Sequence, residues 1–367
     1  MTPSYRFDFG QGSPQEGYTK IEPDTVHDPS VGYGFGETSR INARDRGGEP
    51  LRRDFCIPLD ASFVVDVPDG TYHVTVLMGD ELAATETTIK AGEGRLMLHK
   101  LRTQPGYFAR VSFAVWVTGG RLLLSFTGRA PRVNAMEIRP SSSACTIFLA
   151  GDSTVTDQPA DGYPYAGWGQ MLPQFVKADA AVANYALSGR SSKSFIREGH
   201  LDAIWSRMKP WDYLLIQFGH NDQKYGEERY TEPFTTYKET LKIYLDGARE
   251  RQAFPILVTP VERRFFEEDG TLRDTHGNYL TAVRELAEEE KVPLLDLAAR
   301  SRELYERLGP EGSKSLFMWL APGEFLNFPD GTEDNTHFQE QGAIQIAKLA
   351  ADGLKELRIQ PLNLYLK

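Results

Sequence analysis

The segment Gly151-Asp152-Ser153 stands directly after the apolar run CTIFLA, which places a serine hydroxyl where a buried strand is expected to end. A serine at such a place can cap a helix, or it can act as a nucleophile. A nucleophilic serine needs a base to take its proton, a group that orients the base, and donors that stabilise an oxyanion. Whether the chain supplies these groups decides between the two roles.

Residues suited to each role occur later in the chain. His337 is a candidate base, and Asp334, three residues earlier, can curl back to bind the other ring nitrogen of that histidine. The backbone N–H of Gly189 and the side-chain amide of Asn221 are suitable oxyanion donors, and the N–H of Ser153 could add a third. Ser153 alone would be read as a cap or turn residue. Because independent elements agree on one reaction, we expect it to be the nucleophile of acyl transfer.

The same polar residues are also compatible with two other kinds of chemistry. His220 with Asp222, or Asp334 with His337, could ligate a cation, but no HExxH, paired CxxC or His-x-His signature accompanies them. The chain has 51 acidic residues, enough for the paired carboxylates of glycoside cleavage, but no particular pair stands out. We therefore expect no metal and no cofactor. We interpret His220 as structural or substrate-adjacent.

The elements that must position these groups begin at residue 145. Short buried-type strands alternate there with helical stretches, and the strands read CTIFLA, AVANYAL, YLLIQF, ILVTP and PLLDL. The helical stretches include FIREGHLDAIWSRM, TTYKETLKIYLDGARERQ and, at the end, QEQGAIQIAKLAADGLKEL. This alternation predicts a parallel sheet with helices on both faces. Ligands bind such sheets at the carboxyl ends of the strands. Three polar segments, 151–153, 188–192 and 219–222, directly follow predicted strands, and the segment 334–337 is close enough to join them.

Residues 1–140 follow a different pattern. Short runs rich in Val, Phe, Tyr, Leu and Thr are separated by turn residues, and no long helical period appears. Asp69-Gly70 and Gly119-Gly120 stand between consecutive runs and predict hairpins. Many short strands at this spacing predict a β-sandwich. The linker at 140–144 then separates a first domain, 1–140, from a second, 145–367.

Composition narrows the class of partner. The 367 residues carry a net charge of −10, which argues against nucleic acid, and no apolar run is long enough for a membrane span. The start MTPSYRFDFG lacks the features of a signal peptide, so we expect a cytoplasmic protein. Cys56 and Cys145 fall in different predicted domains, which argues against a disulfide. The oligomeric state is left open.

The polar segments together resemble those of the SGNH (GDSL-type) hydrolases, in their usual order. Over roughly 145–357 the sequence is similar to rhamnogalacturonan acetylesterases. The motifs that carry this similarity are GDSTVTD, the Gly-Trp-Gly-Gln at 167–170, NYALSGRSSKSF, QFGHND and DNTHF. The resemblance implies a three-layer α/β/α sandwich around a five-stranded parallel sheet, a flavodoxin-like arrangement. It implies Ser153, Asp334 and His337 as a catalytic triad, with an oxyanion hole formed by Ser153, Gly189 and Asn221.

The same resemblance implies an activity and a substrate. These esterases remove acetyl groups from pectic poly- or oligosaccharides through an acetyl-enzyme, so an acetylated pectic saccharide is the expected partner. Residues 1–140 resemble a β-sandwich, galactose-binding or carbohydrate-binding-like domain that precedes the esterase domain in some bacterial members. The motifs FDFG, GYGF and VDVPDGTYHVTVLMGD carry this resemblance. Three alternatives stay open: an esterase of acetylxylan or another acetylated oligosaccharide, a lipolytic GDSL esterase, and a non-catalytic glycan-binding protein. The polar segments GRSSKS and GHND favour sugar over lipid.

Overall fold

The structure is a computed structural model that describes residues 4–142 and 144–367. Contacts divide the chain into two compact units. The first comprises residues up to Ala144 together with Val176–Ala181, and the second comprises Cys145–Phe175 and Val182–Lys367. Cys56 lies in the first unit and Cys145 in the second, and both are free and buried.

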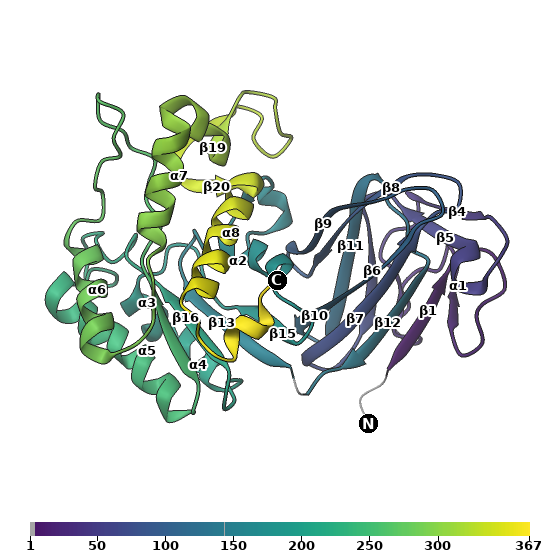
Figure 1. Ribbon diagram of the computed structural model, residues 1–367, viewed down its shortest axis with the longest axis horizontal. Coiled ribbons are helices and arrows are strands. Elements are labelled where there is room, and N and C mark those ends of the chain that lie inside the picture. Colours follow the sequence, from purple (N-terminus) through teal and green to yellow (C-terminus); the bar gives the residue numbers. More distant parts are fainter. Residues whose placement is uncertain (1–3, 143) are drawn as a thin grey trace. The chain divides into compact units, whose positions relative to one another are not determined.

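The first unit is an all-β sandwich of two five-stranded sheets, which agrees with the prediction from the strand pattern (Figure 1). One sheet has the order β10 (Phe108–Val117), β7 (Gly70–Gly79), β12 (Ala135–Pro140), β1 (Tyr5–Phe9), β2 (Thr19–Ile21). The other has the order β3 (Tyr33–Phe35), β6 (Ala61–Asp66), β11 (Arg121–Ala130), β8 (Thr85–Ala91), β9 (Arg95–Thr103). A separate pair, β4 (Ile41–Asp45) and β5 (Asp54–Pro58), is joined by the short helix α1 (Pro50–Arg53).

The sandwich is held together by the alternate side chains that point between the two sheets. Phe63 of β6 lies at the centre of an aromatic cluster, with ring centroids 5.2 Å from Phe7 and 5.1 Å from Phe9 of the facing sheet. All three rings are fully buried, and Phe35 of β3 joins them. The alternation that predicted strands is therefore the alternation between this core and the outer faces.

The two glycine-containing turns are not hairpins, and that prediction is wrong. The strands β6 and β7 on either side of Asp69-Gly70 belong to different sheets, and so do β10 and β11 on either side of Gly119-Gly120. The two turns contact each other, because the Gly120 N–H donates to Asp69 Oδ1 at 3.0 Å. Gly119 and Gly120 adopt φ values of 76° and 75°. Left-handed backbone of this kind serves a crossing between sheets as well as a hairpin, so the residue types alone do not distinguish the two.

The second unit is built on a five-stranded parallel sheet, again as predicted (Figure 1). Its order is β15 (Ala180–Asn184), β13 (Cys145–Gly151), β16 (Tyr213–Gln217), β17 (Phe254–Val258), β18 (Leu294–Leu295). In chain order this is 2-1-3-4-5, the flavodoxin-like arrangement, in which ligands bind beside the first strand at the carboxyl edge. β13 and β16 are fully buried strands, which explains why their sequences are continuously apolar.

Helices flank the sheet in two groups, with α2 and α8 in front of it in the view of Figure 1. One group comprises α3 (Ser192–Arg197), α4 (His200–Trp205), α5 (Lys238–Glu250) and α6 (Asn278–Glu290), and the other comprises α2 (Trp168–Met171), α7 (Leu297–Gly312), α8 (Glu340–Glu356) and α9 (Leu362–Tyr365). The stretch FIREGHLDAIWSRM is two helices rather than one, because Gly199 takes a φ of 79° and separates α3 from α4. Among the helices of the described residues, none is long and apolar enough to cross a membrane.

Candidate active site

Ser153 lies just beyond the carboxyl end of β13, in a tight turn rather than at the start of an α-helix. The N–H groups of Val155 and Thr156 both donate to the carbonyl oxygen of Asp152, at 3.1 Å each, and close this turn. The side chain of Ser153 is therefore not needed as a cap. Its Oγ lies 2.9 Å from Nε2 of His337, 184 residues later in the chain.

His337 is hydrogen-bonded on both ring nitrogens. Its Nδ1 lies 2.6 Å from Oδ2 of Asp334, so Asp334, His337 and Ser153 form one continuous chain of hydrogen bonds. The ring of Tyr165 packs against the imidazole edge-to-face at 5.1 Å. Burial would raise the pKa of the Asp334 carboxyl, but the bond and charge of His337 and two backbone N–H groups outweigh it, and the pKa is lowered. Asp334 is therefore held in the ionised form that orients an imidazole.

A bulge in a strand brings Asp334 and His337 together. They lie on β20 (Thr332–Gln339), which pairs with β14 (Tyr165–Ala166) and with β19 (Phe317–Leu320) in a small sheet. Phe317 pairs with Phe338 and Trp319 with Glu333, so the four residues 334–337 lie opposite one residue of β19. Residues three apart in a regular strand point to opposite faces. The bulge removes that obstacle, and Asp334 Oδ1 then accepts the N–H groups of Thr336 and His337 at 2.6 and 3.1 Å.

The bulge is stabilised by contacts of Asn335 with Trp319 and Arg264, which could not be predicted from the sequence. Oδ1 of Asn335 accepts hydrogen bonds from the Trp319 indole N–H at 2.9 Å and from the Arg264 guanidinium at 2.8 Å. The Arg264 N–H donates to the Asn335 carbonyl at 2.7 Å, and its guanidinium lies 4.8 Å from the centre of a Trp319 ring. In the sequence, Arg263-Arg264 is an unremarkable basic pair. Only its position in space identifies Arg264 as a support of the Asp334–His337 segment.

The predicted oxyanion donors are gathered beside Ser153. Gln158 Nε2 donates to the Ser153 carbonyl at 3.0 Å and to Ser188 Oγ at 3.3 Å, which holds the turn containing Gly189 next to the serine. Gly189 has a φ of 82° and open space where a Cβ would stand, so its backbone conformation, not crowding, calls for glycine. Asn221 Nδ2 donates to the Arg190 carbonyl at 3.0 Å, which places the amide beside Gly189.

The same donors also have N–H groups that are available to an oxyanion. Within residues 4–142 and 144–367, neither the Ser153 N–H nor the Gly189 N–H donates to another protein group. The amide of Asn221 uses one of its two N–H groups on the Arg190 carbonyl. The site thus combines a serine, a hydrogen-bonded Asp–His pair and unoccupied N–H donors, which are the groups that acyl transfer requires.

A second Asp–His pair is buried near the first, close enough for His337 to affect the pKa of His220. Asp152 Oδ2 is 3.1 Å from His220 Nδ1, and Asp152 Oδ1 accepts the N–H and the hydroxyl of Thr154 at 2.9 and 2.8 Å. Burial would raise the pKa of Asp152, but the charge and bond of His220 and the Thr154 donors lower it; burial lowers the pKa of His220 despite Asp152. His220 was predicted to be structural or substrate-adjacent, but nothing in the sequence indicated that its side chain pairs with Asp152.

Asp222, at the end of GHND, ties the Asn221 loop to α3. Its carboxylate accepts from the N–H and the hydroxyl of Ser192 and from the Thr231 hydroxyl. Burial raises the pKa of this carboxyl to about 7 despite these bonds. Within the described part of the chain, no three His, Cys, Asp or Glu side chains gather as a metal site would require. The pairs His220 with Asp222 and Asp334 with His337 thus have no third such ligand there.

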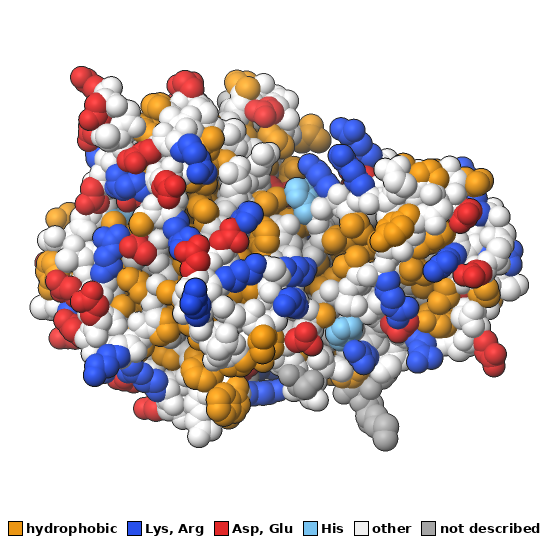
Figure 2. All heavy atoms as spheres, viewed as in Figure 1, with side chains coloured by type: hydrophobic (Ala, Val, Ile, Leu, Met, Phe, Trp, Pro, Cys, Tyr) orange, Lys and Arg blue, Asp and Glu red, His pale blue; other side chains and the backbone are white. Residues whose placement is uncertain are grey.

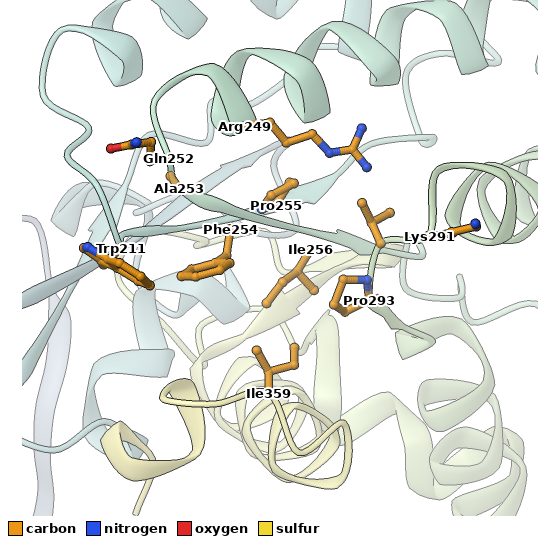
Figure 3. A pocket seen from close by; sticks show the side chains of 11 residues that line it. Trp211, Arg249, Gln252, Ala253, Phe254, Pro255, Ile256, Lys291, Pro293 and Ile359 are labelled. Carbon is orange, nitrogen blue, oxygen red and sulfur yellow. The ribbon is translucent and has the colours of Figure 1, made fainter.

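A hollow of about 490 Å³ opens elsewhere on the second unit (Figure 3). Phe254 begins β17 and Trp211 precedes β16, so the hollow lies at the amino ends of the strands, whereas Ser153 follows a carboxyl end. Its lining is largely apolar and includes none of the predicted site residues. The hydrogen-bonded site at the carboxyl edge is therefore the better candidate for chemistry.

Comparison with known proteins defines the class of this molecule. Residues 149–343 match the GDSL-like lipase/acylhydrolase family, and the chain belongs to that family. It is a carboxylic ester hydrolase of the carbohydrate esterase type. Residues 5–138 match the galactose-binding domain-like family of β-agarase and YxiM-type esterases.

Three individual relatives show which members of the family this chain resembles. Rhamnogalacturonan acetylesterase RhgT of Bacillus subtilis (strain 168) is 50% identical over 211 residues, covering 58% of this chain and 90% of that protein. The probable rhamnogalacturonan acetylesterase YesY of the same organism is 44% identical over 212 residues, covering 58% of this chain and 93% of that protein. The crystal structure of Bacillus subtilis YxiM is similar at a TM-score of 0.54 and 31% identity, covering 98% of this chain and 99% of that one. YxiM, described as an uncharacterised esterase, thus shares both units with this chain.

Proposed function

We propose that this protein is a serine esterase that hydrolyses acetyl esters on rhamnogalacturonan poly- or oligosaccharides. The observation that carries the proposal is the hydrogen-bonded chain from Ser153 Oγ through His337 to Asp334. A serine hydroxyl is a poor nucleophile at its ordinary pKa and becomes effective when a positioned base removes its proton. His337 is at hydrogen-bond distance from Ser153, and Asp334 contacts the other ring nitrogen of His337.

In the first half of the reaction, His337 Nε2 takes the Ser153 proton while Ser153 Oγ attacks the acetyl carbonyl carbon. The negative charge that develops on the carbonyl oxygen is stabilised by the N–H groups of Ser153 and Gly189 and by the Asn221 amide. Asp334 stabilises the imidazolium that forms, since its carboxylate faces Nδ1 at 2.6 Å. His337 then gives the proton to the departing sugar oxygen, and an acetyl-enzyme and a free hydroxyl result.

In the second half, water replaces the sugar. His337, neutral again, takes a proton from the water as it attacks the acetyl-enzyme, and the same donors hold the second oxyanion. Collapse of this intermediate returns the proton to Ser153 Oγ and releases acetate. The bulge in β20 supports both halves, because it keeps the base and its orienting carboxylate on one short segment.

The substrate proposal rests on the relatives and on the polarity of the site. Two relatives carry names of rhamnogalacturonan acetylesterases, and this chain covers nine-tenths of their length at 44% to 50% identity. The loops beside Ser153 present serines, Arg190 and Asn221 rather than apolar side chains, which suits a sugar better than a lipid. We further infer that residues 145–367 form the esterase domain and that residues 1–140 form an accessory carbohydrate-binding-like domain.

An acetate-release panel tests this proposal. Purified protein is incubated with acetylated rhamnogalacturonan oligosaccharides, acetylated xylan fragments and a short-chain lipid ester, and the Ser153→Ala chain serves as the blank. We expect the highest kcat/KM on the rhamnogalacturonan fragments. A preference for xylan fragments by tenfold or more would replace the substrate while keeping the mechanism. A preference for the lipid ester would indicate a lipolytic enzyme.

A labelling experiment separates an esterase from a protein that only binds glycans. A fluorophosphonate reacts with a serine that is activated by a neighbouring base, and we expect one label per chain, on Ser153. The His337→Ala chain is the control and should label far more slowly. Sugar binding without labelling and without acetate release would show that the protein is a glycan-binding module.

A further inference from the structure

The outward face of one sheet in the β-sandwich carries a regular array of polar side chains. The pairing of β1, β12, β7 and β10 sets Arg6, Glu137, Thr75 and Ser112 in one row across the sheet. Two residues along the strands, Arg139 stands opposite His73 in the next row. Side chains two apart along a strand share a face, so both rows face away from the buried core. The floor is polar, with Thr75 and Ser112 joined by a hydroxyl–hydroxyl bond of 2.8 Å.

This face is hollowed. A cavity of about 480 Å³ lies over it, lined among others by Arg6, Arg110, Arg139, His73, Thr75 and Ser112, all of the first unit. Cavities that hold small ligands measure about 300–1,000 Å³. We refer to this cavity as the arginine hollow. It differs in character from the largely apolar hollow of Figure 3, because cationic and hydroxyl groups provide much of its lining.

The charges in the arginine hollow are not balanced. Arg110 donates to Glu137 at 2.8 Å, and the same carboxylate oxygen accepts the Tyr18 hydroxyl at 2.8 Å. Within the described residues, Arg6 and Arg139 form no ion pair with any carboxylate. Arg6 instead lies 6.0 Å from the Tyr18 ring, and Arg139 acts only through space on His73, which Asp179 also influences. Glu137 also lines the hollow, and the Arg6 charge lowers its pKa, so the lining carries three arginines, Arg6, Arg110 and Arg139, against this one carboxylate.

The surrounding unit is compatible with an anionic ligand. Residues 1–144 contain 16 Lys and Arg against 17 Asp and Glu, whereas residues 145–367 contain 25 against 34. The sandwich is thus nearly neutral within a chain of net charge −10, and Figure 2 shows basic side chains distributed over its visible face. An anion approaching the first unit meets much less repulsion than one approaching the second.

We propose that the arginine hollow binds the uronate carboxylates of an acidic saccharide. A guanidinium forms paired hydrogen bonds with a carboxylate, and the hydroxyl groups of Thr75 and Ser112 match the hydroxyls of a sugar ring. That the anion is a saccharide rests on the proposed function, whereas the preference for an anion rests on the excess of arginines over carboxylates in the lining. Binding here would hold an acidic glycan on the β-sandwich independently of the acetyl ester.

The test measures binding by titration calorimetry, with the full chain carrying Ser153→Ala so that no acetyl group is removed. The probe is a galacturonic acid trimer without acetyl groups, which is not a substrate. We expect the double variant Arg6→Gln/Arg139→Gln to weaken binding at least about tenfold, since charge-assisted hydrogen bonds are lost. The matched control is Arg40→Gln/Arg129→Gln, which removes the same charge from exposed positions outside the hollow and should bind like the parent chain.

Two further titrations define the ligand. A neutral galactose trimer should bind at least about tenfold more weakly than the acidic trimer, and sulfate at the same concentration should not compete. Equal affinity of both double variants, or equal affinity for the neutral trimer, would overturn the proposal. Effective competition by sulfate would also overturn it, because it would indicate an unspecific anion site. Failure of the acetate-release panel would leave these results readable, since no catalysis is involved.

Discussion

The Asp334–His337 pair and the Asp152–His220 pair contain the same two residue types but differ in their surroundings. The side chains of Asp334 and His337 are 35% and 30% exposed, whereas those of Asp152 and His220 are 0% and 3% exposed. His337 presents Nε2 to Ser153 Oγ, while Nε2 of His220 is buried without a hydrogen-bond partner among the described residues. An Asp–His pair therefore does not by itself make a base. The second ring nitrogen must reach a nucleophile and a place where substrate can enter.

The sharpest test of this difference replaces each histidine in turn. We expect His337→Ala, like Ser153→Ala, to lower kcat by about 10⁴–10⁶, because the nucleophile loses its base. His220→Gln should keep measurable turnover and lose stability instead. Activity on p-nitrophenyl acetate and thermal unfolding are measured together, with His200→Gln, at a partly exposed histidine, as the control. A His220→Gln chain that folds normally but is as inactive as His337→Ala would contradict the comparison.

The two aspartates should separate in the same way. Asp334→Asn removes the charge that orients His337, and we expect kcat to fall by about 10⁴ while the unfolding temperature stays near that of the parent. Asp152→Asn breaks a fully buried pair and should cost about 3–5 kcal/mol in the free energy of unfolding. Denaturant unfolding and initial rates measure both effects. Similar unfolding curves for the two variants would show that the buried pair contributes little to the fold.

Asn221, next to His220 in the chain, tests the boundary between the buried pair and the reacting groups. We expect Asn221→Ala to lower kcat by about 10²–10³ through the loss of one oxyanion donor. The KM for p-nitrophenyl acetate should change little, because the donor acts mainly on the transition state. Asn327→Ala, in the loop 321–331, is the control. A loss confined to KM would assign Asn221 to substrate binding.

The smallest expected effect concerns pH. Burial lowers the pKa of His220, so below a pH of about 6.5 the unfolded chain takes up a proton that the folded chain does not. The unfolded state is then favoured, and the stability of the parent chain falls as the pH decreases. His220→Gln removes this contribution, so its unfolding temperature should fall less between pH 7.5 and 5.5, by a few degrees. Parallel curves for the two chains would contradict the assignment of a neutral buried imidazole.

The sequence predicted those features that depend on residue type and periodicity. Continuous apolar runs predicted the buried strands β13 and β16, and the residue types that acyl transfer requires singled out Ser153 and His337, which the structure places in contact. The sequence could not show pairing in three dimensions. Asp152 and His220 are 68 residues apart, and Arg264 bonds to Asn335 across 71 residues. Neither contact leaves a local pattern in the sequence.

The sequence also did not predict the connection at the Asp69-Gly70 turn or the bulge in β20, because both depend on which strands are neighbours. Asp69-Gly70 has the residue types of a hairpin, yet its flanking strands lie in different sheets. Turn residues report the local backbone angles but not which strand is the next neighbour. Likewise, Asp334 and His337 were predicted to meet, but the extra residues in β20 that allow it follow from the register with β19. Register depends on the partner strand and therefore on the tertiary fold.

The bulge in β20 has a consequence for how such a site can be altered or transplanted. The geometry between Asp334 and His337 depends on the number of residues that bulge outward, with Asn335 fastened to Trp319 and Arg264, and not on the length of the strand. The geometry of the segment 333–338 is thus set by its register with β19 and by the bonds that Asn335 accepts from Trp319 and Arg264. Deletion of a single residue within the bulge would change that register and separate the base from its carboxylate.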